Sequence, residues 1–191
     1  MARQSRMLAL GTPAPAFALP DSAGGKTVAL ADFADAPALL VAFICNHCPY
    51  VKHLLDGFVA FARDFGPRGL AIVAISSNDA AAYPADGPQE MHRTAALKGF
   101  TFPYLYDETQ QVARAYEAIC TPDFFLFDRQ RRLAYRGQFD PSRPGSAVAV
   151  TGKDLRAAAE ALLQGQPVPS PQIPSVGCSL KWKPGQQPDW A

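Results

Sequence analysis

The sequence lacks a long hydrophobic run, a cluster of basic residues and an abundance of cysteine. Its apolar stretches are far shorter than the roughly 20 residues of a membrane-spanning helix. The apolar part of the first 13 residues is likewise too short for a signal-peptide core. A net charge of +1 argues neither for nor against an acidic partner, and no cluster of Lys and Arg indicates a nucleic-acid partner. We therefore expect a cytoplasmic protein that binds neither membranes nor nucleic acid.

Cysteine is scarce, and the way it is placed is informative. The chain has four cysteines in 191 residues. In a cytoplasmic protein such a small set is more often catalytic, redox-active or metal-binding than a framework of structural disulfides. With 48% hydrophobic and 18% charged residues, the remainder is ordinary for a soluble protein that forms a core. Its length predicts one domain with room for an appendage.

The apolar pattern predicts an α/β fold. Residues 38–44 form a continuous apolar run, as expected of a strand covered on both faces, and 70–76 form a second. Between them, residues 49–65 carry apolar side chains at helical spacing. Further helices are expected over 89–98, 110–118 and 153–164, and further strands over 102–107, 124–127 and 133–137. This alternation predicts a mixed, mostly parallel central sheet with flanking helices and an antiparallel edge.

The last 26 residues differ in composition from the rest. Residues 166–191 contain six of the 18 prolines, both tryptophans and Cys178. A plain linker would not usually carry so much apolar and sulfur content. We expect a domain formed by residues 1–165 and an extended C-terminal tail, 166–191, that packs against it.

Two cysteines stand where the first apolar strand gives way to a helix, in Cys45-Asn46-His47-Cys48-Pro49. Free N–H groups and the positive end of the helix dipole stabilise a thiolate at such a position, and the thiolate is the nucleophile. The simpler alternative is a pair of thiols packed as small hydrophobic side chains. A zinc site built from Cys45, Cys48, His47 or His53 is a third interpretation, but a second ligand pair at matching spacing is missing. We predict thiol chemistry, with no metal and no bound cofactor.

The arrangement resembles the thioredoxin-like superfamily, in its redoxin (AhpC/TSA-type) branch, over roughly residues 8–165. The resemblance rests on the proline-rich lead-in 11–17, the strand–cysteine–helix element, Thr121-Pro122 before an apolar strand, and the closing hairpin and helix. It implies a thioredoxin-like fold in which Pro122 is cis and faces the reactive cysteine. The tail resembles that of a peroxiredoxin-like subgroup, which gives it no assigned role.

Two registers are open for the cysteine motif. Without gaps, Cys48-Pro49-Tyr50-Val51 overlays the family's Cys-x-x-Cys, with Val51 in place of the second cysteine and Pro49 in the first helical turn. In the other register Cys45-Asn46-His47-Cys48 is the motif, and His47 would favour the thiolate and make the pair more oxidising. We prefer the first. In both, Cys48 is the predicted catalytic residue and Cys45 its partner.

The chain also departs from the family patterns. The position of the threonine or serine that precedes a peroxiredoxin's reactive cysteine by three residues is occupied by Cys45, and that of the arginine that polarises the peroxide by Pro122. The buried acid of thioredoxin would fall within 39–42, which is apolar. We therefore expect dithiol–disulfide exchange rather than efficient peroxide reduction. Either His47 or a residue of the polar loop 77–86 takes the place of the acid.

The sequence thus predicts a thiol–disulfide oxidoreductase that acts on a protein or small-molecule disulfide and receives electrons from a cellular thiol reductant. Cys48 attacks, and Cys45 resolves the mixed disulfide unless Cys120 or Cys178 lies closer. Thr121 and Pro122 would hold the substrate backbone as an added strand. The alternatives are a peroxiredoxin-like thiol peroxidase with antioxidant activity, whose Cys48 passes through a sulfenic acid, and a non-catalytic binding or zinc-binding protein. The sequence does not indicate an oligomeric state.

Overall fold

A five-stranded sheet forms the centre of the computed structural model, which describes residues 2–191. Its strands, in the order β6-β5-β4-β8-β9, are β6 (Tyr104–Tyr106), β5 (Leu70–Ser76), β4 (Ala38–Phe43), β8 (Asp123–Phe127) and β9 (Leu133–Gly137). β5 runs parallel to both of its neighbours, whereas β8 runs antiparallel to both of its own. The predicted mixed α/β sheet is confirmed, and two of its four pairings are parallel.

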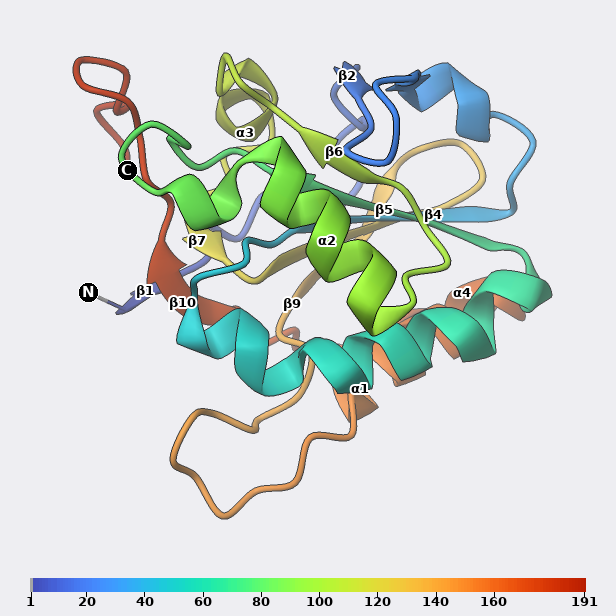
Figure 1. Cartoon of the computed structure of the whole chain (residues 1–191). Coiled ribbons are helices and arrows are strands. Elements are labelled where there is room, and N and C mark those ends of the chain that lie inside the picture. Colours follow the sequence, from blue (N-terminus) through green and yellow to red (C-terminus); the bar gives the residue numbers. More distant parts are fainter. Residues whose placement is uncertain (1) are drawn as a thin grey trace.

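Helices cover both faces of this sheet (Figure 1). They are α1 (Pro49–Phe65), α2 (Pro88–Lys98), α3 (Gln111–Ala115) and α4 (Lys153–Leu163), with short 3-10 helices at Leu30–Phe33, Gly66–Arg68 and Pro84–Asp86. α1, α2 and α4 lie on one side, and α3 lies on the other. Within residues 2–191, no helix is both long and apolar enough to cross a membrane.

Strand β4 belongs to the core on both of its faces, which explains its uninterrupted apolar sequence. Side chains alternate along a strand, so Leu40 and Ala42 join the cluster under α1, while Leu39, Val41 and Phe43 join the cluster under α3. All five are fully buried. Because neither face meets water, β4 is a rigid support that ends two residues before Cys45.

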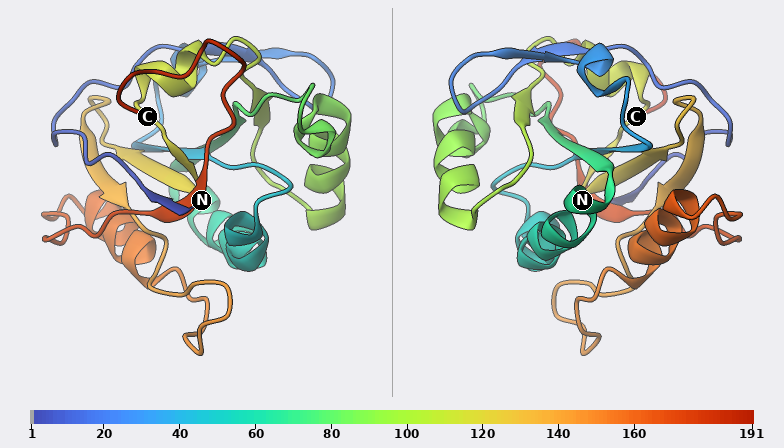
Figure 2. Two further views of the ribbon diagram at one scale, coloured as in Figure 1. Left: turned by 90° about the vertical axis from the view of Figure 1, so that its left-hand side faces the viewer. Right: turned by 90° about the vertical axis from the view of Figure 1, so that its right-hand side faces the viewer.

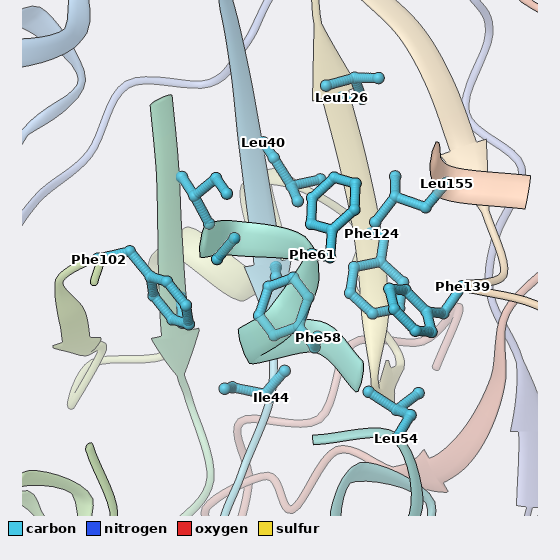
Figure 3. Packing of buried hydrophobic residues seen from close by; sticks show 14 of the residues in the cluster. Leu40, Ile44, Leu54, Phe58, Phe61, Phe102, Phe124, Leu126, Phe139 and Leu155 are labelled. Atoms are coloured by element: carbon cyan, nitrogen blue, oxygen red, sulfur yellow. The ribbon is translucent and has the colours of Figure 1, made fainter. Parts of the chain in front are cut away.

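The helix that follows is held to the sheet by aromatic packing. Figure 3 shows Phe58 of α1 among the rings of Phe102, Phe124 and Phe139. Its ring centroid lies 5.3 Å from that of Phe102, 5.5 Å from Phe124 and 6.2 Å from Phe139. Such tilted and edge contacts are the preferred geometries of aromatic pairs. They fix the direction of α1, and hence the place where α1 begins.

Two small sheets complete the fold. β2 (Ala18–Pro20) and β3 (Thr27–Ala29) form an antiparallel hairpin. β1 (Ala2–Gln4), β10 (Val176–Ser179) and β7 (Cys120–Thr121) form an antiparallel sheet in the order β1-β10-β7. Figure 2 shows the N-terminus beside this part of the tail. The sequence predicted a packed tail but neither β1 nor β7, and the domain boundary at residue 165 stays a prediction.

Candidate active site

Cys48 occupies the N-cap of α1, and Pro49 is the first helical residue. The missing N–H of a proline costs little at this position, because the first N–H groups of a helix have no partner within it. The backbone N–H of Val51 is directed at the Cys48 sulfur. The Cys48 side chain makes no capping hydrogen bond, so the Val51 N–H influences its sulfur through its orientation at the helix N-terminus.

Thr121 contacts both cysteines of the motif. Its hydroxyl lies 3.2 Å from Cys45 Sγ, and its carbonyl oxygen lies 3.2 Å from Cys48 Sγ. The peptide bond between Thr121 and Pro122 is cis, which confirms the isomer that the family resemblance implied. The end of β7 is thus in contact with both sulfurs.

The two sulfurs of the motif differ strongly in acidity. A hydrogen bond from the Cys45 thiol lowers the pKa of Cys48 to about 4, and the Cys178 thiol and two backbone N–H groups act in the same direction, against burial. The pKa of Cys45 is raised well above its usual value by the same hydrogen bond, by burial and by the charge of Asp86. Of the two thiols, Cys48 is therefore the one that ionises more readily, and Cys45 is the one that keeps its proton.

The other two cysteines lie differently with respect to Cys48. Burial raises the pKa of the Cys178 thiol to about 11, and its interaction with Cys48 acts in the same direction. It is only half-buried, whereas the other three cysteines are buried. The sulfur of Cys120 lies 3.7 Å from the carbonyl oxygen of Pro122, and burial raises its pKa well above normal. The structure thus brings Cys45 and Cys178 to Cys48 and directs Cys120 elsewhere.

A buried carboxylate organises the loop that carries the cysteines. Asp86 is fully buried, and it accepts hydrogen bonds from the backbone N–H of Asn46 at 2.8 Å and of His47 at 3.0 Å. Its second oxygen lies 2.5 Å from His47 Nδ1 and 2.8 Å from Asn78 Nδ2. The sequence indicated the loop 77–86 as a substitute for the missing acid but did not select Asp86. The signal available was a polar loop after the strand next to β4.

His47 is held on its other side by Tyr83. The two rings are stacked, with centroids 4.9 Å apart and an interplanar angle of 16°. Lys181, from the tail, lies 5.8 Å from the centre of the Tyr83 ring. The imidazole is therefore fixed by a carboxylate and an aromatic ring, and it remains partly exposed.

Three side chains of this region could in principle hold a metal ion. Ligand atoms of Cys45, His47 and Asp86 lie within 4.8 Å of one another. The polar atoms of this group already hydrogen-bond to each other, to backbone N–H groups and to Thr121, so protein contacts account for the cluster. His53, which the zinc interpretation included, instead bonds through Nε2 to the Ser142 hydroxyl at 2.7 Å.

The tail occupies the edge of β7 at which we expected a substrate strand to bind. In the antiparallel pairing of β10 with β7, Cys178 is opposite Thr121 and Ser179 is opposite Cys120. The expectation that Thr121 and Pro122 receive an added substrate strand needs correction, because this edge of β7 already has a strand on it. The strand comes from the same chain.

The match to a family model covers residues 10–136, which include the cysteine motif, the cis-proline and the sheet, and that model describes the AhpC/TSA family. The chain belongs to the AhpC/TSA family. This confirms the redoxin branch that the residues indicated.

Among proteins similar to this AhpC/TSA member, two crystal structures match it along nearly its whole length. An uncharacterised conserved protein from Geobacillus kaustophilus is 52% identical, with a TM-score of 0.95, covering 97% of this chain and 98% of that one. A hypothetical protein from Sinorhizobium meliloti 1021 is also 52% identical, with a TM-score of 0.94, covering 95% and 99%. Because both cover at least 95% of this chain, the tail is part of the shared fold.

A Mycobacterium tuberculosis protein named "putative peroxiredoxin" is 32% identical over 108 residues. The match covers 56% of this chain and spans 63% of the length of that relative. The thioredoxin domain of a thiol-disulfide oxidoreductase from Bacteroides vulgatus is 19% identical, with a TM-score of 0.57, covering 72% of this chain and 91% of that one. The latter likeness confirms the thioredoxin-like fold.

Proposed function

We propose that this AhpC/TSA protein is a thiol–disulfide oxidoreductase. The observation that carries the proposal is the contrast between the Cys48 thiolate at the start of α1 and the protonated Cys45 in hydrogen-bond contact with it. A low-pKa thiolate beside a protonated thiol is suited to attack a disulfide and then to release the product.

The reaction has two exchange steps. In the first, the Cys48 thiolate attacks one sulfur of the substrate disulfide, whose S–S bond breaks, and one product thiolate leaves. In the second, Cys45 loses its proton and attacks the Cys48 sulfur, and the second product thiol leaves. The protein now holds an internal disulfide. A cellular dithiol reductant returns two electrons and two protons to it.

The second step requires a base, because the pKa of Cys45 is raised. His47 and Asp86 both have a polar atom within 4.8 Å of the Cys45 sulfur, and they are hydrogen-bonded to each other. We assign to this pair the acceptance of the Cys45 proton. His47 lies in the loop after β4, and Asp86 lies in the segment after β5. The position at which the family resemblance led us to expect a buried acid lies instead within the apolar strand β4.

Peroxide reduction is the second candidate function. It is favoured by family membership and by the name of the Mycobacterium tuberculosis relative. In that reaction Cys48 would attack the peroxide O–O bond, become a sulfenic acid and condense with a second thiol, releasing water. Disulfide exchange ranks first because Cys45 and Pro122 stand where a peroxiredoxin has its threonine and arginine.

The test compares disulfide and peroxide consumption by the wild type, Cys48→Ser and Cys120→Ala, with a dithiol reductant, in the presence and in the absence of a metal chelator. We expect disulfide reduction that falls to background in Cys48→Ser and persists in Cys120→Ala, a control that also removes a buried thiol. If peroxide alone is consumed, the second candidate is correct. If neither substrate is consumed, or the chelator abolishes activity, the exchange proposal is wrong.

A further inference from the structure

The tail strand β10 lies where an extended substrate would pair with the residue before the cis-proline. Its residue Cys178 is opposite Thr121, whose carbonyl oxygen lies 3.2 Å from Cys48 Sγ, and Cys178 packs against the core cluster that includes Cys48. Figure 1 shows β10 beside both β7 and the start of α1. In this position β10 places a cysteine against the nucleophile, as a bound substrate strand would.

The fit between β10 and β7 depends on a glycine. A Cβ atom added to Gly177 would lie 2.0 Å from the carbonyl oxygen of Thr121, 2.5 Å from its carbonyl carbon and 3.0 Å from the nitrogen of Pro122. Backbone atoms of this kind cannot move aside as a flexible side chain would. The tail therefore approaches the cis-proline as closely as two backbones allow, and only glycine permits it.

Buried side chains of the main domain anchor the residues that follow β10. Asn78 accepts a hydrogen bond from the Lys181 N–H at 2.8 Å. Gln110, which is 1% exposed, donates to the Lys181 carbonyl at 2.9 Å and accepts from the Lys183 N–H at 2.8 Å. On its other edge β10 pairs with β1. The tail is thus a fixed part of the fold, with strands on both sides of β10.

Little open space remains beside the reactive sulfur. Cys48 is 0% exposed. The hollow on the side of Pro122 lined by Tyr50 and Val176 does not reach Cys48, and its volume of about 10 Å³ is roughly the space of one water molecule. A polypeptide would have to displace β10 and leave its backbone groups without partners. A small disulfide needs only local movement around the half-buried Cys178.

We propose that β10 takes the place of a polypeptide substrate, so that this protein exchanges thiols with small-molecule disulfides of the glutathione type. The inference rests on the proposed function and narrows its substrate class. The chemistry is that of the two exchange steps above, with the oxidised small thiol as the acceptor of two electrons and a cellular dithiol as their donor.

The experiment measures kcat/KM per disulfide for oxidised glutathione and for insulin, with the full chain and a dithiol reductant, after subtraction of the Cys48→Ser rate. We expect insulin to react at least about tenfold more slowly, a factor that corresponds to about 1.4 kcal/mol. Insulin reduction at an equal or higher rate would overturn the inference and leave the proposed function standing. Reduction of neither would overturn both.

A glycine pair provides the matched variants. Gly177→Ala should displace β10 and raise the ratio of insulin to glutathione turnover, whereas Gly24→Ala, whose added Cβ meets no atom within 4 Å, should leave it unchanged. An unchanged ratio in folded Gly177→Ala contradicts the proposal. If Gly177→Ala does not fold, hydrogen exchange of residues 176–179 in the wild type decides instead. We expect these amides to stay protected during glutathione turnover, and loss of protection would contradict a resident strand.

Discussion

The carboxylate of Asp86 holds His47 by both its ring and its backbone, with Nδ1 and the main-chain nitrogen at 2.5 Å and 3.0 Å. Asp86 has no exposed surface and lies 39 residues beyond His47. Buried carboxylates need such partners to remain in a protein interior. The pair fixes the loop between β4 and α1 and offers Cys45 a nearby proton acceptor.

The variant Asp86→Asn separates two roles of this carboxylate. Its charge raises the pKa of Cys45, so a purely electrostatic role predicts faster resolution once the charge is removed. A role as proton acceptor predicts the opposite, and we expect slowing of about tenfold to hundredfold, within the range of general-base catalysis. The measurement is single-turnover formation of the internal disulfide as a function of pH.

The control for this variant is Asp56→Asn. Asp56 lies on the surface of α1, its side chain is 81% exposed, and it pairs with Lys98 of α2. Removal of its charge should leave the rate of internal disulfide formation unchanged. Alkylation of Cys48 should also proceed normally in Asp86→Asn. Equal or faster resolution in Asp86→Asn would remove the proton-acceptor role.

The pH dependence of Cys48 alkylation follows from its lowered pKa. The thiolate is the reactive form, and with a pKa of about 4 it is already fully formed at pH 6. We expect the rate with iodoacetamide to be flat from pH 6 to 8 and to fall as the pH drops through about 4. Peptide mass spectrometry at each pH measures it. A rate that rises between pH 7 and 9 would show an ordinary thiol.

Removal of the second cysteine should trap the first exchange step. With oxidised glutathione, Cys45→Ser is expected to accumulate a glutathione adduct on Cys48, because the resolving thiol is missing. Intact-mass spectrometry detects the adduct. In the wild type a peptide linking Cys48 to Cys45 is expected, whereas one linking Cys48 to Cys178 would transfer the resolving role to the tail. Cys178→Ser is the matched variant for that comparison.

Asp123 offers a test of stability against pH. It is fully buried, and burial raises its pKa well above the usual value. Its contribution to stability is therefore complete below the unfolded-state pKa and is lost as the pH rises through the raised folded-state value. Because asparagine does not ionise, Asp123→Asn should not lose stability as the pH rises. A gain of about 1 kcal/mol at pH 7 would raise Tm by about 2–4 °C.

This difference should shrink at pH 4, where the wild-type carboxyl is protonated as well. Thermal unfolding of both proteins at pH 4 and pH 7 measures the effect. A variant that is less stable than the wild type at pH 7 would show that the ionised carboxylate is favoured in the fold.

The central sheet and its helices could be predicted because their signals are local. Strand β4 is buried on both faces, so its apolar run is continuous, and α1 repeats apolar residues at helical spacing. The start of α1 could also be predicted from the sequence, because proline is favoured in the first turn of a helix and Pro49 directly follows Cys48. The position of Cys48 therefore followed from neighbours in the sequence.

Two further groups of the site, unlike Cys45, come from segments far from Cys48 in the sequence. Asp86 and Cys178 reach the cysteine loop across 39 and 130 residues, and no local pattern distinguishes them from other polar or cysteine residues. Strand β10 has no apolar alternation of its own, and it forms a strand only because β1 and β7 supply its hydrogen bonds. The sequence alone determined the fold class, through burial and periodicity, and it predicted Cys48 as the nucleophile, through helix geometry. Tertiary structure decided the acid and the occupant of the substrate edge, because long-range contacts make both.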